Sequence, residues 1–186
     1  MNQVDRAITF AVKAHEGQLR KDGSLFILHP LEVATIAGTM TKDSDVIAAA
    51  VLHDTVEDTP VTAQDILDNF GERIAELVAS ETEDKRPERS PGETWMIRKE
   101  ESLEVLKDCP DEGIKILWLS DKLSNIRAFA REYDSLGEAF FSRFNQPDPA
   151  KQKWYFTSIA DLLSDLSGFD AYKEYCRLVE HVFSKY

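Results

Sequence analysis

The run Val46-Ile-Ala-Ala-Ala-Val-Leu52 is apolar throughout, and the polar segment His53-Asp-Thr-Val-Glu-Asp58 follows it without a break. In a helix, residues three and four apart are neighbours, so the three acidic residues of this segment share one face. Carboxylates so close together repel one another unless a cation lies among them. Imidazole combined with carboxylates suits a divalent metal ion. The stretch therefore predicts an apolar core helix that ends at a metal site.

A second helical segment, 113–127, carries an acidic group within an apolar stripe. Asp121 lies four residues after Leu117 and seven after Ile114, which is the spacing of one helix face. A lone ionised carboxylate in a core is very costly unless it is paired or bound to a metal. Asn125 follows one turn later on the same face. Two helices therefore carry polar groups where leucine is expected.

The composition is typical of a globular protein with one core. The chain has 186 residues, of which 42% are hydrophobic and 30% charged. The net charge of −12 argues against non-specific binding to nucleic acids or to anionic membranes, because both require a basic surface. A metal ion and a few local basic side chains can still favour an anionic substrate inside one pocket.

The two cysteines, Cys109 and Cys176, have neither metal-ligand spacing nor the number expected of a disulfide framework. The N-terminus lacks the basic start and apolar stretch of a signal peptide. No apolar run approaches the ~20 residues that span a membrane. These features predict a cytoplasmic protein.

Helical periodicity dominates the chain, and no convincing run alternates like a strand. Thr62, with Asp65 three residues later, predicts a capping box at a helix start. We predict an all-α, bundle-like fold with a single domain over residues 1–186. The expected helices are 4–15, 30–40, 44–58, 62–70, 72–79, 94–107, 111–132, 149–166 and 170–184.

A metal site is indicated by four residues taken together: His29, His53, Asp54 and Asp121. Alone, a histidine is more often a hydrogen-bonded cap or core residue, and the aspartate of segment 113–127 can form an ion pair. Two histidines and two aspartates, with an acidic pair next to them, match an octahedral metal site with water in its open positions.

The pattern His … His-Asp … Asp resembles the signature of HD-domain metal-dependent phosphohydrolases. Several longer segments are similar, in order and spacing, to the Rel/SpoT alarmone hydrolases, and the resemblance extends over about residues 4–166. They are AHEGQLRKDG (Ala14 to Gly23), FILHPLEVA (Phe26 to Ala34), AAVLHDTVEDT (Ala49 to Thr59), FGERIAELV (Phe70 to Val78), LSDKLSNIRAF (Leu119 to Phe129) and KWYF (Lys153 to Phe156).

This resemblance implies a single HD-domain protein, a stand-alone small alarmone hydrolase with a small nucleotide as its partner. It would remove the 3′-pyrophosphate of ppGpp or pppGpp, giving GDP or GTP and pyrophosphate. The family's metal ligands correspond to His29, His53, Asp54 and Asp121, which would hold Mn²⁺. A bound metal lowers the pKa of its water from 15.7 toward about 7.

The resemblance also assigns roles to the acidic pair and to four further residues. Glu57 and Asp58 would orient or deprotonate the attacking water rather than bind the metal directly. The substrate-binding positions correspond to Arg20, Lys21, Asn125 and Tyr155.

Each of these residues also has an ordinary explanation. Arg20 and Lys21 can be solvated loop charges, and Tyr155 can be a core aromatic. The acidic pair can simply end a helix, although carboxylates are unfavourable at that end of the helix dipole. Arg98 and Lys99, which could assist with phosphate, are interpreted as a solvated helix face.

Four positions depart from the usual pattern of the resembled family: Asp22, Phe26, Ser124 and Ala128. They leave the metal and catalytic residues intact and bear on the choice of base. Two alternatives therefore stay open, which are the same chemistry on ppApp or another phosphorylated nucleotide, and a non-catalytic alarmone-binding module.

Overall fold

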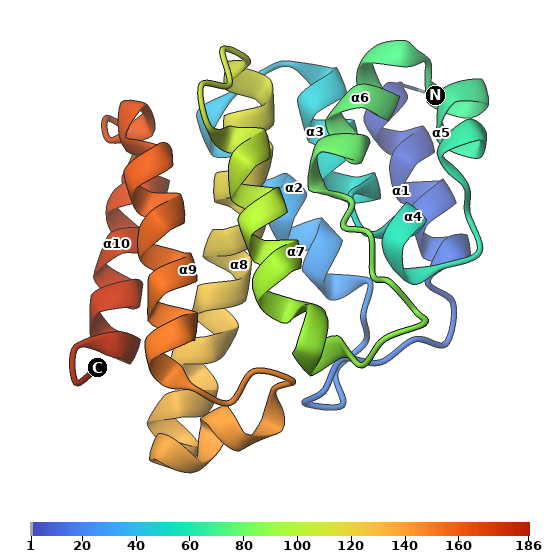
Figure 1. Cartoon of the computed structure of the whole chain (residues 1–186). Coiled ribbons are helices and arrows are strands. Elements are labelled where there is room, and N and C mark those ends of the chain that lie inside the picture. Colours follow the sequence, from blue (N-terminus) through green and yellow to red (C-terminus); the bar gives the residue numbers. More distant parts are fainter. Residues whose placement is uncertain (1) are drawn as a thin grey trace. The chain divides into compact units, whose positions relative to one another are not determined.

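The computed structural model describes residues 2–186, and they divide into two compact units. Unit 1 consists of residues 2–82 and Asp111–Asp121, and unit 2 consists of Glu83–Pro110 and Lys122–Tyr186. Both units are built from helices, which confirms the all-α fold predicted from the sequence (Figure 1). Two compact units are compatible with one domain or with two, so the single domain over residues 1–186 stays a prediction.

Unit 1 is organised around the helix α3, which contacts α1, α2 and α6 (Figure 1). Six of its nine residues are buried, among them three consecutive alanines, Ala48 to Ala50, whose small side chains allow neighbouring helices to approach closely. Contact on several sides explains why the run from Val46 is apolar throughout. The helices of unit 1 are α1 (Gln3–Ala14), α2 (Leu28–Met40), α3 (Ser44–Leu52), α4 (Thr55–Asp58), α5 (Ala63–Phe70), α6 (Glu72–Glu81) and the first part of α8 (Glu112–Leu136).

The helix predicted over residues 44–58 is in fact two helices, so that prediction was wrong at its centre. Helix α3 ends at Leu52, and α4 begins at Thr55. The hydroxyl of Thr55 donates to the Leu52 carbonyl at 2.6 Å, and His53 Nδ1 lies 2.9 Å from the Ala50 carbonyl oxygen. Such side-chain bonds compete with the amides of a continuing helix. The break leaves His53 and Asp54 in a turn.

The predicted capping box at the start of α5 is confirmed. The Thr62 amide donates to Asp65 Oδ2 at 2.8 Å, and the Asp65 amide donates to Thr62 Oγ1 at 3.1 Å. At the other end of α5, Gly71 has a φ of +86°, a conformation that side-chain-bearing residues rarely adopt. The chain can therefore turn sharply from α5 into α6.

Asp111 fastens the start of α8 to α6 within unit 1. Its carboxylate accepts two hydrogen bonds from Arg73, at 2.5 and 2.9 Å, and also accepts from the amides of Gly113 and Ile114 at 2.8 and 3.3 Å. A Cβ at Gly113 would lie 2.8 Å from Arg73 Nη2 and 2.9 Å from Val46 Cγ2. Glycine is therefore required for this close approach.

Replacing Asp111 by asparagine keeps an oxygen for the α8 amides but removes the charge that Arg73 binds. The hydrogen bonds from Arg73 lower the pKa of Asp111 below its usual 3.8. The ion pair therefore stabilises the fold above that pH and ceases to do so as the pH falls through the lowered pKa. We expect Asp111→Asn to reduce the free energy of unfolding by about 1 kcal/mol at neutral pH and by much less at a pH of about 2, measured by urea denaturation.

Asp170→Asn is the matched control, because the Asp170 side chain is exposed and pairs with Lys173 only one turn away. It should leave stability unchanged at both pH values. An equal loss for Asp111→Asn at neutral and acid pH would contradict the proposed role of the charge.

Unit 2 is built around α9, which contacts α7 and α10 (Figure 1). Its core is rich in aromatic rings, including Phe140, Phe156, Tyr175 and Phe183. The Tyr175 hydroxyl donates to the Phe156 carbonyl at 2.9 Å, which satisfies the polar end of a fully buried ring. The elements of unit 2 are α7 (Pro91–Leu106), the rest of α8, η1 (Gly137–Arg143), α9 (Pro149–Leu162), η2 (Ser164–Leu166) and α10 (Asp170–Phe183).

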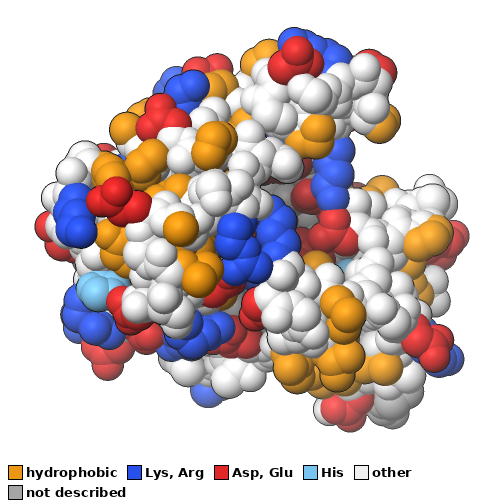
Figure 2. Space-filling model, turned by 90° about the horizontal axis from the view of Figure 1, so that it is seen from below, with side chains coloured by type: hydrophobic (Ala, Val, Ile, Leu, Met, Phe, Trp, Pro, Cys, Tyr) orange, Lys and Arg blue, Asp and Glu red, His pale blue; other side chains and the backbone are white. Residues whose placement is uncertain are grey.

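Acidic residues outnumber basic ones, 34 to 22, which gives the negative net charge. Figure 2 shows acidic, basic and apolar side chains interspersed on one face of the molecule. Within residues 2–186, no helix combines the length and the apolar character that crossing a membrane requires.

Candidate functional site

Three helices of unit 1 bring buried metal-ligand side chains together. His29 lies in the first turn of α2, His53 follows the last residue of α3, and Asp121 lies in α8. All three residues are at most 5% exposed. One ligand atom from each lies within 4.8 Å of the others, a spacing that allows a shared metal ion.

Asp54 joins this cluster from the turn that separates α3 and α4. Its Oδ2 lies 3.2 Å from His53 Nε2 and 3.5 Å from His29 Nε2. The Oδ1 of Asp121 lies 3.0 Å from His29 Nε2 and 3.5 Å from His53 Nε2. The four residues singled out in the sequence as metal ligands are thus neighbours in the fold, and we refer to them as the His-Asp cluster.

The tautomer of His53 supports a cation at this point. A carbonyl oxygen only accepts, so Nδ1 of His53 donates its proton to the Ala50 carbonyl, 2.9 Å away. In a neutral ring, Nε2 then carries a lone pair. That nitrogen is buried and makes no hydrogen bond, although two carboxylate oxygens lie 3.2 and 3.5 Å from it. A lone pair facing carboxylates is unfavourable, and a divalent ion between them removes the conflict.

The electrostatics of the His-Asp cluster favour positive charge. Burial opposes protonation of His53, but the Asp54 and Asp121 carboxylates outweigh it and hold the pKa of His53 well above its usual 6.5. Burial also acts to raise the pKa of Asp54, yet His53 and His29 lower that pKa to about 2. The donor set, with two imidazoles and two carboxylates, fits a divalent metal ion.

The predicted catalytic pair follows the cluster directly in the chain. Glu57 and Asp58 are half-buried residues of the short helix α4, whose N-cap is Asp54. The break after α3 starts a new helix here, so the pair belongs to a separate four-residue segment rather than to the end of a long helix. Their catalytic role stays a prediction.

Arg20 and Lys21 lie in a tight loop of unit 1. The Arg20 amide donates to the Ser24 carbonyl at 2.9 Å, and an isolated bridge joins Leu19 to Leu25. Arg20 is half-buried, whereas Lys21 is exposed. The half-burial of Arg20 sets it apart from an ordinary solvated loop charge.

Gln18 links this loop to α4, a role that the sequence analysis missed. Its Nε2 donates to the Asp58 carbonyl at 2.8 Å, while its Oε1 accepts from His15 Nδ1 at 2.8 Å. Its own carbonyl accepts from the Phe26 amide at 3.0 Å. The only sequence signal was its position within the segment from Ala14 to Gly23, which carries no periodicity that singles out a glutamine.

Replacing Gln18 by leucine tests this link. The change leaves the Asp58 carbonyl and the buried His15 ring nitrogen without their partner, so we expect a loss of about 1–3 kcal/mol in the free energy of unfolding, measured with urea. Gln64→Leu is the control, because Gln64 is exposed on α5 and donates only to Asp68 at 2.7 Å. Equal stability of the two variants would show that the Gln18 link contributes nothing.

Unit 2 contains a pocket of about 230 Å³ with aromatic and basic walls. Asn125 and Tyr155, two of the predicted substrate-binding residues, both line it. Lys99 Nζ lies 4.7 Å from the centroid of the Tyr155 ring, within range of a cation–π interaction. Trp95 meets the same ring edge to face, with centroids 6.1 Å apart. Tyr155 is therefore a buried residue that also borders a cavity.

The interpretation of Arg98 and Lys99 as a solvated helix face was wrong. Their side chains are only 11% and 18% exposed, and both bind the carboxylate of Glu83 at 2.6 Å. Glu83 lies between the helices predicted over residues 72–79 and 94–107 and was assigned no role from the sequence. Trp95 and Lys122, which also line the pocket, were missed. Trp95 lies outside the segments that resemble the family, and Lys122 lies inside LSDKLSNIRAF but was assigned no role.

Comparison with known proteins connects this arrangement to one family. The family described as "HD domain" matches residues 7–140. A protein of Aquifex aeolicus, named guanosine-3′,5′-bis(diphosphate) 3′-pyrophosphohydrolase, is 37% identical over 125 residues, which are 67% of this chain and 17% of that protein. A GTP pyrophosphokinase of Myxococcus xanthus is 32% identical over 126 residues, with the same coverage. The chain thus spans about a sixth of the length of these relatives.

Two solved structures share the fold. The protein lmo0812 of Listeria monocytogenes superimposes with a TM-score of 0.71 at 32% identity, covering 84% of this chain and 94% of that one. A metazoan ortholog of SpoT, described as hydrolysing ppGpp, gives a TM-score of 0.72 at 22% identity, covering 100% and 96%. At 22% identity the second similarity establishes the fold alone.

Proposed function

Because the chain belongs to the HD domain family, we propose that it is a Mn²⁺-dependent hydrolase that removes the 3′-pyrophosphate of ppGpp or pppGpp. The observation that carries this proposal is the buried His-Asp cluster, in which Nε2 of each histidine lies 3.0–3.5 Å from two carboxylate oxygens. A purely structural core has no reason to bury such a set, because unpaired buried charge is costly. The name of the Aquifex aeolicus relative supports the choice of substrate.

In the proposed site, His29, His53, Asp54 and Asp121 hold the metal. A bound metal ion supplies Lewis acidity and lowers the pKa of coordinated water. The Ala50 carbonyl fixes the His53 ring so that Nε2 faces the metal position.

Glu57 and Asp58 are proposed to handle the proton of the attacking water. A carboxylate within hydrogen-bond reach of that water can accept its proton while the water oxygen bonds to the phosphorus next to the ribose. It can return the proton to the ribose 3′-oxygen, which leaves as its bond to that phosphorus breaks. The Gln18 side chain holds the carbonyl of Asp58, which restrains the backbone that carries this pair.

The residues proposed to bind substrate are Arg20, Lys21, Asn125 and Tyr155. A guanidinium such as that of Arg20 can stack on a base, whereas a lysine ammonium acts as a point charge for phosphate. Aromatic rings such as Tyr155 offer a surface for planar or apolar parts of a ligand.

A second candidate substrate is the adenosine alarmone ppApp. The observation that favours it is the departure of Phe26, Ser124 and Ala128 from the family pattern. Phe26 stacks on His15 at 4.7 Å and meets His29 edge to face at 6.2 Å, so it packs next to a proposed metal ligand without offering a hydroxyl. The same catalytic groups serve either nucleotide.

Metal binding can be tested without turnover. Mn²⁺ at about 100 times its dissociation constant should stabilise the folded protein by about 2.7 kcal/mol and raise its midpoint of thermal unfolding by about 5 °C or more. Asp121→Asn should abolish most of this shift, because it removes a ligand charge from the cluster. Differential scanning fluorimetry with and without Mn²⁺ measures the effect.

Asp134→Asn provides the matched control, because it removes the carboxylate of an exposed aspartate–histidine pair, Asp134 with His181 at 2.7 Å. This variant should keep the full Mn²⁺ shift. If Asp121→Asn kept it too, the proposed metal centre would be wrong.

The activity is tested by Mn²⁺-dependent release of pyrophosphate from ppGpp and ppApp, assayed side by side. Glu57→Gln and Asp58→Asn should each lower kcat by roughly 10²–10⁴-fold while leaving the thermal shift with Mn²⁺ in place. Glu76→Gln, an exposed position on α6, should behave like the unmodified protein.

The ratio of kcat/KM for the two nucleotides decides between the substrates. Normal turnover in both Glu57→Gln and Asp58→Asn would show that the proposed proton-transfer role of the pair is wrong. Failure of the unmodified protein to release pyrophosphate from either nucleotide, alongside an active control enzyme, would overturn the proposed function.

A further inference from the structure

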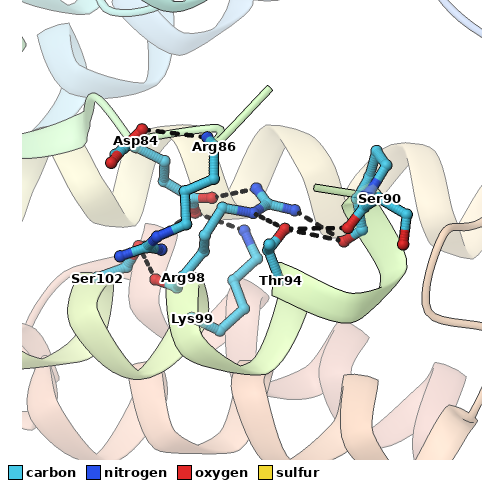
Figure 3. Close-up of polar contacts among 9 residues, drawn as sticks. Asp84, Arg86, Ser90, Thr94, Arg98, Lys99 and Ser102 are labelled. Atoms are coloured by element: carbon cyan, nitrogen blue, oxygen red, sulfur yellow. Dashed lines mark hydrogen bonds and ion pairs between the residues drawn. The ribbon is translucent and has the colours of Figure 1, made fainter. Parts of the chain in front are cut away.

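In unit 2, three side chains of α7 donate hydrogen bonds to the carboxylate of Glu83. Its Oε2 accepts from Arg98 Nη1 at 2.6 Å, and its Oε1 accepts from Lys99 Nζ at 2.6 Å and from Ser102 Oγ at 3.1 Å. The Glu83 side chain is only 12% exposed. Figure 3 shows these three donors along α7, with the dashed contacts converging between them and the preceding loop.

The two cations at Glu83 have different surroundings. Arg98 also donates to Thr94 Oγ1 at 3.3 Å and to the Pro91 carbonyl at 3.4 Å, both in the first turn of α7 (Figure 3). Its bond to Glu83 therefore joins the start of α7 to the preceding loop. Lys99 instead has its ammonium over the Tyr155 ring, at the wall of the 230 Å³ pocket. Glu83 therefore holds one cation for structure and one beside a cavity.

Charge keeps this arrangement in place at neutral pH. Burial acts to raise the pKa of Glu83, but Lys99, Lys122 and Arg98 outweigh it and lower that pKa. Burial also opposes protonation of Lys99, while Tyr155 and Glu83 raise its pKa. Both members of the Glu83–Lys99 pair are thus charged, and a second cation on the same carboxylate leaves the group with excess positive charge.

The geometry leaves Lys99 able to bind an anion. An ammonium has three donors on a flexible four-carbon stem, and ordering that stem costs conformational entropy. One N–H of the Lys99 ammonium donates to Glu83, and another side of the ammonium faces the ring of Tyr155. A ligand in the pocket that carries an anionic oxygen can therefore meet an ammonium that is already ordered.

We infer that Glu83 is a positioning residue for substrate, which orders the Lys99 ammonium at the pocket wall so that it binds a phosphate group of the nucleotide. This inference rests on the proposed function, which supplies the class of ligand. The aromatic lining from Trp95 and Tyr155 suits the planar or apolar part of the same molecule. The negative charge of Glu83 repels a phosphate group, but Arg98 and Lys99 both neutralise it. The gain from an ordered Lys99 ammonium therefore exceeds this repulsion.

Steady-state kinetics on ppGpp with Mn²⁺ give the first test. Glu83→Gln keeps the shape but loses the charge, so KM should rise about tenfold while kcat stays within about twofold. Glu83→Asp, which keeps the charge, should recover most of the lost affinity. Glu101→Gln is the matched control. Glu101 lies on α7, as the donors to Glu83 do, but its side chain is 54% exposed and pairs with Arg86 at 2.6 Å. The KM of this variant should be unchanged.

A double-mutant cycle with Lys99→Met separates positioning from a general structural effect. If Glu83 acts through Lys99, adding Glu83→Gln to Lys99→Met should not raise KM further. An additive increase in KM would overturn the inference, and so would tighter nucleotide binding by Glu83→Gln. If Glu83→Gln does not fold, Ser102→Ala provides a milder change at the same carboxylate oxygen, and it should raise KM about twofold to threefold.

A readout without turnover keeps this inference distinct from the proposed function. The Lys99 side-chain signal in a lysine-labelled NMR spectrum, assigned with Lys99→Met, should shift on titration with inorganic pyrophosphate, and Glu83→Gln should weaken that binding about tenfold. If the protein releases no pyrophosphate from ppGpp but this response holds, the proposed function fails and the positioning role stands. Normal turnover with an unchanged KM in Glu83→Gln would overturn the positioning role alone.

Discussion

The rest of unit 1 depends on burying two histidines and two aspartates at one point next to the core. Ionised groups out of water must be paired or bound to a cation, and no single helix can supply all four. Helix α2 supplies His29, the turn after α3 supplies His53 and Asp54, and α8 supplies Asp121. The close packing of α3 against its neighbours and the fastening of α8 by Asp111 hold these elements where the four side chains meet.

The buried carboxylate of Glu83 in unit 2 has a different set of neighbours. Glu83 is surrounded by ammonium, guanidinium and hydroxyl donors, so the protein itself supplies its counter-charge. In the His-Asp cluster the carboxylates face imidazole nitrogens that bear a lone pair when neutral, and the missing positive charge must come from a proton or a metal ion. The two sites thus differ in whether the protein's own side chains supply the counter-charge of a buried carboxylate.

The helical fold, the capping box at Thr62 and the four members of the His-Asp cluster were all predictable from the sequence, because each depends on local spacing or on a motif. The break between Leu52 and Thr55 was not predictable from apolar periodicity, since it arises when side chains take carbonyls that a continuing helix would use. The burial of Lys99 was not predictable for a related reason. A charged residue on a polar helix face is expected to be solvated, and only the fold shows that Glu83, 16 residues earlier, binds and covers it.

The sequence by itself determined which residue types carry the chemistry, because imidazole and carboxylate groups at unusual positions in apolar helices are visible from spacing alone. It also determined the helical class, through the 3.6-residue period of its core. Only the tertiary structure decided the tautomer of His53, the link from Gln18 to α4 and the convergence of Arg98 and Lys99 on Glu83. These depend on contacts between segments far apart in the chain or on side-chain rotamers, and neither leaves a periodic trace in the order of residues.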